Sequence, residues 1–257
     1  MSTSTKTVSF YSFKGGTGRS TTLANVAYAL AEQGANVGCM DLDLAAPGLH
    51  MIFPNIGTAH LNTKTIHDYL GNSGGTVHNI ANYIIDVGEK IDGSLSGDLF
   101  LIAGDIKPPG TGNPSETMRN ALELRESFTE QCDLDYLLLD SRSGLSNHMV
   151  PLFDEADQFL AFHRWTHQHK TGTKRLAKWL QKGPVLENMM SVASNVPSSV
   201  GADEIERWVT SNLYIYDFSD YHVVNSSKIL EDGEKVVKLT DPDARIVDQY
   251  ESLAEKL

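Results

Sequence analysis

The stretch FYSFKGGTGRST, residues 10–21, holds the residue types and spacing that point most clearly to chemistry. A β-rich run precedes it and a helical pattern follows, so backbone N–H groups and the positive end of a helix would face a bound phosphate. Ser20 is placed to put its hydroxyl on Mg²⁺, and Thr21 to donate to an α-phosphate. An ordinary glycine-rich turn explains the glycines but not the lysine before them. The glycines that let the backbone close around an anion are Gly15, Gly16 and Gly18.

The loop departs at two positions from the common phosphate-binding pattern G-x-x-x-x-G-K-[ST]. Aligned on Gly18, the first glycine position holds Phe13 and the lysine position holds Arg19. A lysine, Lys14, stands instead near the start of the loop. Arginine keeps the positive charge but is larger, planar and forked, so it could grip phosphate with two hydrogen bonds or displace the γ-phosphate and slow hydrolysis.

The run KGGTGRST, residues 14–21, resembles the deviant Walker A motif KGGxGK[ST]T of the ParA/MinD family of P-loop ATPases, in the SIMIBI class. In that family the first lysine reaches across a nucleotide-sandwich dimer to the partner's phosphates, and by resemblance this residue is Lys14. The resemblance implies catalytic roles for Lys14 and Arg19, and it makes ATP binding a firmer expectation than turnover because of the arginine. The implied nucleotide-binding residues of the loop are Gly15, Gly16, Thr17, Gly18, Arg19, Ser20 and Thr21.

Residues 39–43, CMDLD, end a predicted strand where the family carries its DxD motif, in switch I. The resemblance implies that Asp43 positions the attacking water and that Asp41 acts on magnesium through its water shell. The following LAAPGLH contains Pro47 and Gly48, consistent with a mobile switch. The alternative is a pair of acids at a strand end that cap a loop.

Residues 136–140, YLLLD, form an apolar run that ends in one acid, as a Walker B strand does. A carboxylate at that edge, here Asp140, can hold a magnesium-bound water. The SRSG that follows resembles the switch II region, in which Gly144 could present its amide to the γ-phosphate and Arg142 could contact phosphate or a partner subunit. The expected magnesium set is Ser20, Asp41 and Asp140.

Residues 192–197, VASNVP, end a later predicted strand. The family often has an asparagine here that reads the adenine edge, and an amide offers the donor and the acceptor that adenine requires. By resemblance this residue is Asn195. The alternative is a turn asparagine before a proline.

Strand and helix signals alternate, which favours one doubly wound, mostly parallel β-sheet flanked by helices. We expect a single ATPase domain over residues 1–257, with loops over 54–64 and 104–114. A last helix should begin near Pro242 with Asp241 as its N-cap. Strands are expected at Thr7–Phe13, Asn36–Met40, Leu99–Ala103, Tyr136–Leu139, Gln158–Phe162 and Met190–Ser194, and earlier helices at Ser20–Gln33, Ser115–Cys132, Asn147–Phe153 and His167–Gln181.

The composition excludes several classes of protein. A net charge of −12 and a pI near 5.1 argue against a surface that binds nucleic acid or anionic lipid all over. Two distant cysteines without a CxxC argue against a disulfide framework or an iron–sulfur site and favour a reduced, cytoplasmic protein. We expect no signal peptide and no membrane span, because neither a charged leader nor a long apolar window is present.

The segment 163–182 is basic inside this acidic chain, with six Lys or Arg and no acid. It could contact DNA or an acidic protein partner, or it could be a solvated helix face. The predicted last helix is acidic, so membrane cycling through a basic amphipathic tail is not expected.

The leading hypothesis is a Mg·ATP-dependent homodimerisation switch with slow or partner-stimulated ATP hydrolysis, which positions or regulates a protein partner or nucleic acid. A second is a nucleotide-binding regulator or scaffold with little hydrolysis, because Arg19 replaces the Walker A lysine. A third is a kinase or transferase of the P-loop group, for which no second phosphate site is evident. A nitrogenase-type reductase would need paired cluster cysteines. The sequence does not identify the cargo or the pathway.

Overall fold

The computed structural model describes residues 4–57, 63–71, 79–91, 95–105, 113–144, 150–181, 188–230 and 233–257. Their strands form one eight-stranded sheet in the order β3-β4-β2-β5-β1-β6-β7-β8. Neighbouring strands run parallel except β3, which is antiparallel to β4, so the expected doubly wound α/β fold is confirmed. The strands are β1 Lys6–Ser12, β2 Val37–Leu42, β3 Ile85–Asp86, β4 Leu99–Ile102, β5 Tyr136–Ser141, β6 Gln158–Arg164, β7 Met189–Val196 and β8 Phe218–Asn225.

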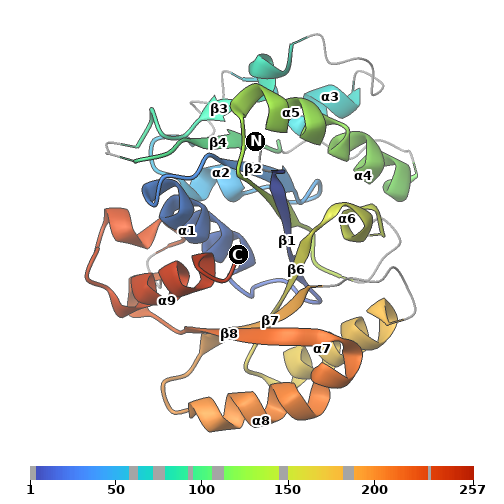
Figure 1. Cartoon of the computed structure of the whole chain (residues 1–257), viewed down its shortest axis with the longest axis vertical. Coiled ribbons are helices and arrows are strands. Elements are labelled where there is room, and N and C mark those ends of the chain that lie inside the picture. The colour runs from blue at the N-terminus through green and yellow to red at the C-terminus, as the bar shows by residue number, and fades with distance from the viewer. Residues whose placement is uncertain are drawn as a thin grey trace.

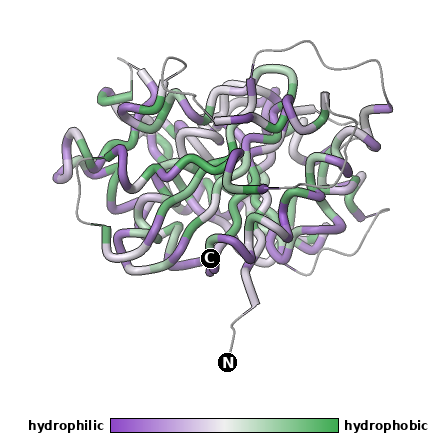
Figure 2. The backbone as a smooth tube through the Cα atoms, turned by 90° about the horizontal axis from the view of Figure 1, so that it is seen from above, coloured by the Kyte–Doolittle hydropathy of each residue, from purple (hydrophilic) through white to green (hydrophobic). Residues whose placement is uncertain are grey.

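Helices cover both faces of this sheet (Figure 1). One hydrophobic cluster lies between the sheet and α1, α2 and α9, and a second lies between the sheet and α3 to α8. Seen from above, the hydrophobic segments gather in the interior of the tube and the hydrophilic ones at its periphery (Figure 2). The α-helices are α1 Arg19–Glu32, α2 Leu49–Ile52, α3 Ile66–Gly71, α4 Pro114–Leu122, α5 Leu124–Cys132, α6 Val150–Glu155, α7 His167–Leu180, α8 Ala202–Asn212 and α9 Arg245–Ala254.

The six expected strands are present, but the strands β3 and β8 and the helices α2, α3 and α8 were not foreseen. β8 has the sequence FSDYHVVN, whose polar residues give it no apolar run, and it lies at the edge of the sheet. The expected helix Ser115–Cys132 is two helices, because the chain turns at Glu123 between α4 and α5. The expected helix Asn147–Phe153 is α6, and its first predicted residues lie outside the described part of the chain, as do parts of the expected loops 54–64 and 104–114.

The expected start of the last helix is wrong. The Asp241 carbonyl accepts the Ala244 N–H at 3.2 Å, which closes a separate turn, and α9 begins at Arg245 with Ala244 as its N-cap. The proline therefore starts the turn before the helix and not the helix itself. The buried face of α9 and of the chain end is formed by Ile246, Tyr250, Leu253 and Leu257. No helix in the described ranges is long and apolar enough to span a membrane.

The strand register brings the candidate site residues to one edge of the sheet. Ser12, the last residue of β1, is paired with Phe162 of β6. Asp41 of β2 is paired with Asp140 of β5, which also neighbours β1. Since ligands of open α/β sheets bind outside the carboxyl ends of the strands, this edge is where a site is expected.

Acidification should destabilise the protein through His222 on β8. This buried ring contacts the Gln249 carbonyl oxygen through Nε2 at 2.8 Å, and burial lowers its pKa from 6.5 to about 4. Between these two values the unfolded chain binds a proton that the folded chain does not, so the free energy of unfolding falls as the pH falls.

We therefore expect the free energy of unfolding of the wild type to fall by about 1–2 kcal/mol more between pH 7 and pH 5 than that of a His222→Gln variant. Glutamine keeps an N–H donor for the Gln249 carbonyl but does not titrate in this range. Urea unfolding of both proteins at the two pH values measures the difference. Identical pH dependence in both would contradict the prediction.

Candidate functional site

The loop between β1 and α1 has the backbone of an anion cradle. Gly16 and Gly18 have φ values of +72° and +69°, a left-handed conformation that glycine adopts without strain. Gly18 is the N-cap of α1 and brings no capping side chain, so the first N–H groups of the helix are left for another acceptor. This is the arrangement that binds phosphate at a helix N-terminus.

Phe13 stands where the common loop pattern has glycine, and the structure gives a packing reason for it. Its ring lies against the backbone of α7 at Gly172, where an added Cβ would come within 2.1 Å of the ring. Phe13 therefore packs the start of the loop against α7. This explains the first of the two departures from the common motif.

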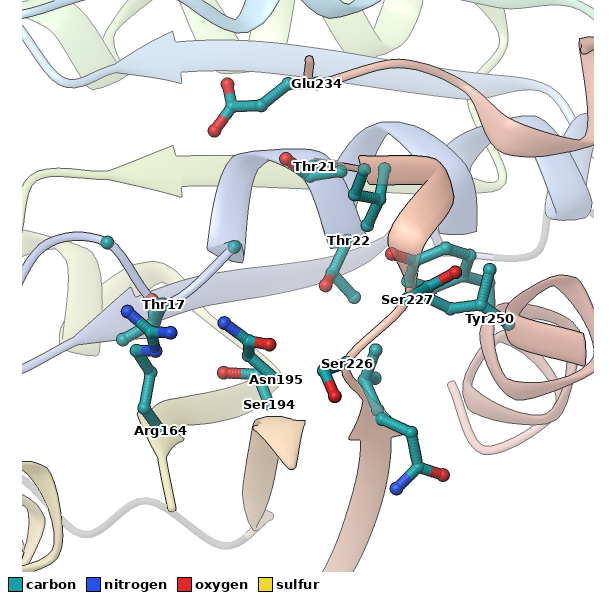
Figure 3. Close-up of a pocket in the computed structure, with 16 residues that line it drawn as sticks. Thr17, Thr21, Thr22, Arg164, Ser194, Asn195, Ser226, Ser227, Glu234 and Tyr250 are labelled. Atoms are coloured by element: carbon teal, nitrogen blue, oxygen red, sulfur yellow. The ribbon is translucent and has the colours of Figure 1, made fainter. Parts of the chain in front are cut away.

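A cavity of about 470 Å³ extends from this loop to the ends of β7 and β8 and to α9. Figure 3 shows its lining side chains, with Thr22 on α1 facing Ser226, Ser227 and Tyr250. The Thr21 hydroxyl is buried and has no hydrogen-bond partner among the described residues. An unpartnered buried hydroxyl on the wall of a cavity fits a ligand oxygen, and the volume lies in the usual range for a small-molecule site.

Arg19 points to the acids at the strand ends. Its Nε donates to Asp140 Oδ1 at 2.5 Å, and its Nη2 lies 3.7 Å from Asp43 Oδ2 and 3.4 Å from Ser20 Oγ. Burial opposes the charge of Arg19, but the charge and hydrogen bond of Asp140, with the charges of Asp43 and Asp41, outweigh it and raise the pKa of the guanidinium. The structure thus brings together the predicted arginine, the two switch acids and the Walker B acid.

Asp41 caps the loop that follows β2, which is the alternative that the sequence left open for these acids. Its Oδ2 accepts the backbone N–H groups of Gly48 and Leu49 at 2.9 and 3.0 Å, and its Oδ1 accepts that of Asp43 at 3.2 Å. The carboxylate therefore holds the 43–48 loop and the start of α2. Burial, then the charge of Asp140, raises the pKa of Asp41 above its ordinary value.

The donor set fits a magnesium ion that is shared with phosphate. Three carboxylates, of Asp41, Asp43 and Asp140, face one guanidinium, and their mutual repulsion would be relieved by a divalent cation. Within the described ranges no group of three His, Cys, Asp or Glu side chains could hold a metal ion. Mg²⁺ usually takes one or two carboxylates with water and substrate phosphates, so Ser20 and Asp140 are the residues that would hold it directly, and Asp41 would act through its water shell.

Lys14 is half-buried at the entrance of the loop, and no hydrogen bond or ion pair joins it to another described residue. Burial, then the charges of Arg164 and Lys14, lower the pKa of His169. Lys14 is therefore close to His169, near the start of α7. A free ammonium at this position is available to a group from outside the chain.

The SRSG segment, residues 141–144, begins with the last residue of β5 and lies beside the loop. The Ser143 hydroxyl lies 3.6 Å from where a Cβ on Gly15 would stand, and the Gly144 N–H donates to the Ser12 carbonyl at 3.2 Å. The Tyr11 hydroxyl donates to the Gly144 carbonyl at 2.5 Å. The amide expected to face a γ-phosphate is therefore bonded to β1 in this structure.

Asn195 lies on the cavity wall, as the sequence suggested, but it is paired with a residue whose place in the site was missed. Arg164, the last residue of β6, lines the same cavity, and its guanidinium lies within hydrogen-bond distance of the Asn195 amide when the amide oxygen is turned toward it. The sequence reveals Arg164 only as one of six cations in the basic segment. In that segment Lys170 lies over the ring of Trp165 at 4.2 Å, while Lys174, Arg175 and Lys178 are exposed on α7.

Replacing Arg19 by methionine should destabilise the fold. Both members of the Arg19–Asp140 pair are buried, and removing one partner leaves an uncompensated charge, at a cost of about 3 kcal/mol. Urea unfolding measures this loss. A second variant, Arg19→Met with Asp140→Leu, should recover part of it, because the buried partner of the arginine is removed as well while Asp41 and Asp43 remain. An unchanged stability in the single variant would contradict the pairing.

The two cysteines are not arranged as cluster ligands. Cys39 is fully buried in β2, where burial raises its pKa, and Cys132 is half-buried at the end of α5. Iron–sulfur clusters are bound by thiolates, which this burial disfavours.

A glycine loop between a strand and a helix, with acids at the ends of neighbouring parallel strands, defines a P-loop nucleotide-binding fold. Residues 3–70 match a family model described as "ParA: NUBPL iron-transfer P-loop NTPase". Among solved structures, the ParA family ATPase from Chlorobium tepidum TLS aligns over 99% of this chain and 100% of its own, with a TM-score of 0.72 and 17% identity. The septum site-determining protein MinD from Pyrococcus horikoshii OT3, complexed with Mg-ADP, aligns over 98% of this chain and 95% of its own, with a TM-score of 0.70 and 20% identity.

The resemblance to the ParA/MinD type of P-loop ATPase is therefore confirmed, and this chain has the fold of that type. A curated relative, the iron–sulfur cluster carrier protein of Pseudomonas fragi, is 32% identical over 157 residues, which are 54% of this chain and 53% of that protein. The chain spans about half the length, or less, of the curated iron–sulfur carriers that it matches.

Proposed function

We propose that the chain is a nucleotide-dependent switch that binds Mg·ATP, forms a homodimer around it and hydrolyses it slowly. The observation that carries the proposal is the cavity that joins the glycine loop, the unpartnered Thr21 hydroxyl and Asn195. Phosphates suit one end of that cavity and a purine base the other. The complex of MinD from Pyrococcus horikoshii with Mg-ADP, on a similar fold, adds support.

The side chains would divide the work as follows. The N–H groups of the glycine loop and of the first turn of α1 bind phosphate oxygens, and Thr21 donates its hydroxyl. Ser20 and Asp140 hold magnesium, which when bound neutralises charge on the phosphates. Asp43, at the exposed side of the acid group, orients the attacking water. Lys14 reaches the phosphates of the second subunit and closes the dimer.

A second function, nucleotide binding with little hydrolysis, is favoured by one specific observation. Arg19 is bound through Nε to Asp140, and its charge also faces Asp43. An arginine that must leave these acids before it can serve the γ-phosphate would slow the chemical step. The two functions differ in turnover and not in binding.

The cargo is proposed only as an acidic or nucleic-acid partner for the exposed cations of α7. Iron–sulfur cluster transfer, which the name of the Pseudomonas fragi relative suggests, is not proposed because this chain contains no CxxC and both of its cysteines are at least half-buried.

Mg·ATP should stabilise the protein against heat. A ligand at about 100 times its Kd adds about 2.7 kcal/mol to the free energy of unfolding, which raises the midpoint by several degrees. Differential scanning fluorimetry with ATP, with and without Mg²⁺, measures the shift. Ser20→Ala should lose the part that depends on Mg²⁺, whereas Ser219→Ala, on β8 away from the loop, should keep it. No shift with ATP under either condition would refute the proposal.

A further inference from the structure

Arg164 and Asn195 meet at the ends of two neighbouring strands. Arg164 of β6 is paired with Ser194 of β7, so Asn195 follows one position later. The pairing of β7 with β8 is irregular between Ser194 and Val196, and Asn195 has a φ of +50°. Figure 3 shows the two side chains side by side below Thr17 of the glycine loop. Asparagine is among the few non-glycine residues that adopt this left-handed conformation readily.

The contact gives the Asn195 amide one orientation. With Oδ1 toward Arg164, the oxygen accepts from Nη2 at 2.5 Å and from Nε at 3.3 Å. The reverse orientation would set Nδ2 donors against guanidinium donors, so the hydrogen-bond network assigns the oxygen to the arginine. A carbonyl oxygen has two lone pairs, and one guanidinium uses both. Only the Nδ2 donors of Asn195 are left for a ligand.

Both side chains lie on the wall of the 470 Å³ cavity. Its glycine-loop end suits phosphates, while Val224, Leu230 and Ile246 give the remaining wall the apolar character that suits a base. Two amide side chains line the cavity, those of Asn195 and Asn225.

We propose that Arg164 sets the base preference of the pocket by fixing the orientation of the Asn195 amide, an inference that rests on the proposed nucleotide binding. Adenine presents an amine donor at position 6 beside the N7 acceptor, whereas a 6-oxo purine presents two acceptors. An unrestrained asparagine can match adenine with its oxygen and its nitrogen together. An amide whose oxygen is held by Arg164 offers donors only, so it suits the 6-oxo edge and weakens the preference for adenine. Arg164 is thus a positioning residue.

The test compares ATP with inosine triphosphate, which has the same phosphates and sugar but oxygen at position 6. Calorimetry gives the Kd of each in the presence of Mg²⁺. We expect a Kd ratio, inosine triphosphate over ATP, near or below one for the wild type, and about tenfold higher for Arg164→Met, because the freed amide then pairs with the amine. Arg164→Lys keeps the charge but cannot use both lone pairs, so it should raise the ratio too. A ratio that stays unchanged or falls in both variants overturns the proposal.

Asn195→Ala supplies the control for action through the amide. In that background Arg164→Met should leave the ratio unchanged, because there is no amide to orient. An equal rise in both backgrounds would mean that Arg164 contacts the base itself, and it would overturn the positioning role. Failure of the proposed function gives a different result, namely a wild type that binds neither triphosphate, whereas binding of both with an unmoved ratio defeats only the inference.

Discussion

Replacing Lys14 by alanine should abolish ATP-driven dimerisation while the monomer still binds nucleotide. In the sandwich dimer that the motif implies, the Lys14 ammonium reaches the partner's phosphates and is buried there. Removing one member of such a desolvated charge pair weakens association by about 100-fold or more. The lysine makes no hydrogen bond or ion pair with another described residue, so its loss should not disturb the fold. Sedimentation velocity with a non-hydrolysable ATP analogue measures the dimer.

The matched control is Lys178→Ala, which removes an exposed cation from α7 and leaves the loop intact. That variant should dimerise as the wild type does. If Lys14→Ala dimerises normally with the analogue bound, the sandwich arrangement fails for this protein, whatever its turnover.

Asp43→Ala should lower the rate of phosphate release from Mg·ATP by about 10²- to 10⁴-fold, the usual contribution of a group that handles the proton of the nucleophile. Binding should change little, because Asp43 lies on the exposed side of the acids and its link to Arg19 is long, at 3.7 Å. A coupled phosphate assay and calorimetry separate the two quantities.

Asp43→Asn is the matched variant, because an amide can still accept the Ala46 N–H that Asp43 Oδ1 accepts at 3.2 Å. Equal loss of turnover in both variants assigns the effect to the carboxylate charge and not to the loop. Unchanged turnover in both would exclude Asp43 as the water-positioning acid. A wild type that binds ATP but releases no phosphate supports the regulator function, and Arg19→Lys should then restore turnover.

Local patterns predicted the parts of the fold and site that depend on neighbouring residues. The glycines before α1, the apolar runs of β2 and β5 and the acids near their ends are signals within a few positions, and each element lies within two residues of its expected bounds. β8 was not predicted, because an edge strand needs no apolar run. The turn at Glu123 was not predicted, because no glycine or proline marks it.

Contacts between distant segments could not be predicted. Arg164 meets Asn195 only because β6 and β7 are parallel and in a particular register. The roles of Lys14, Asp43 and the magnesium residues remain predictions.

The Phe13 ring occupies the space that a side chain at position 172 would need, although the two positions are far apart in the sequence. The substitutions that position 13 tolerates therefore depend on the size of the residue at position 172, and the reverse also holds. A directed-evolution library that varies either position alone should therefore yield few folded members, while joint variation that keeps their summed volume constant should yield many. The same contact ties the geometry of the phosphate loop to the helix that carries the exposed cations, so selection on a binding surface would also act on the loop.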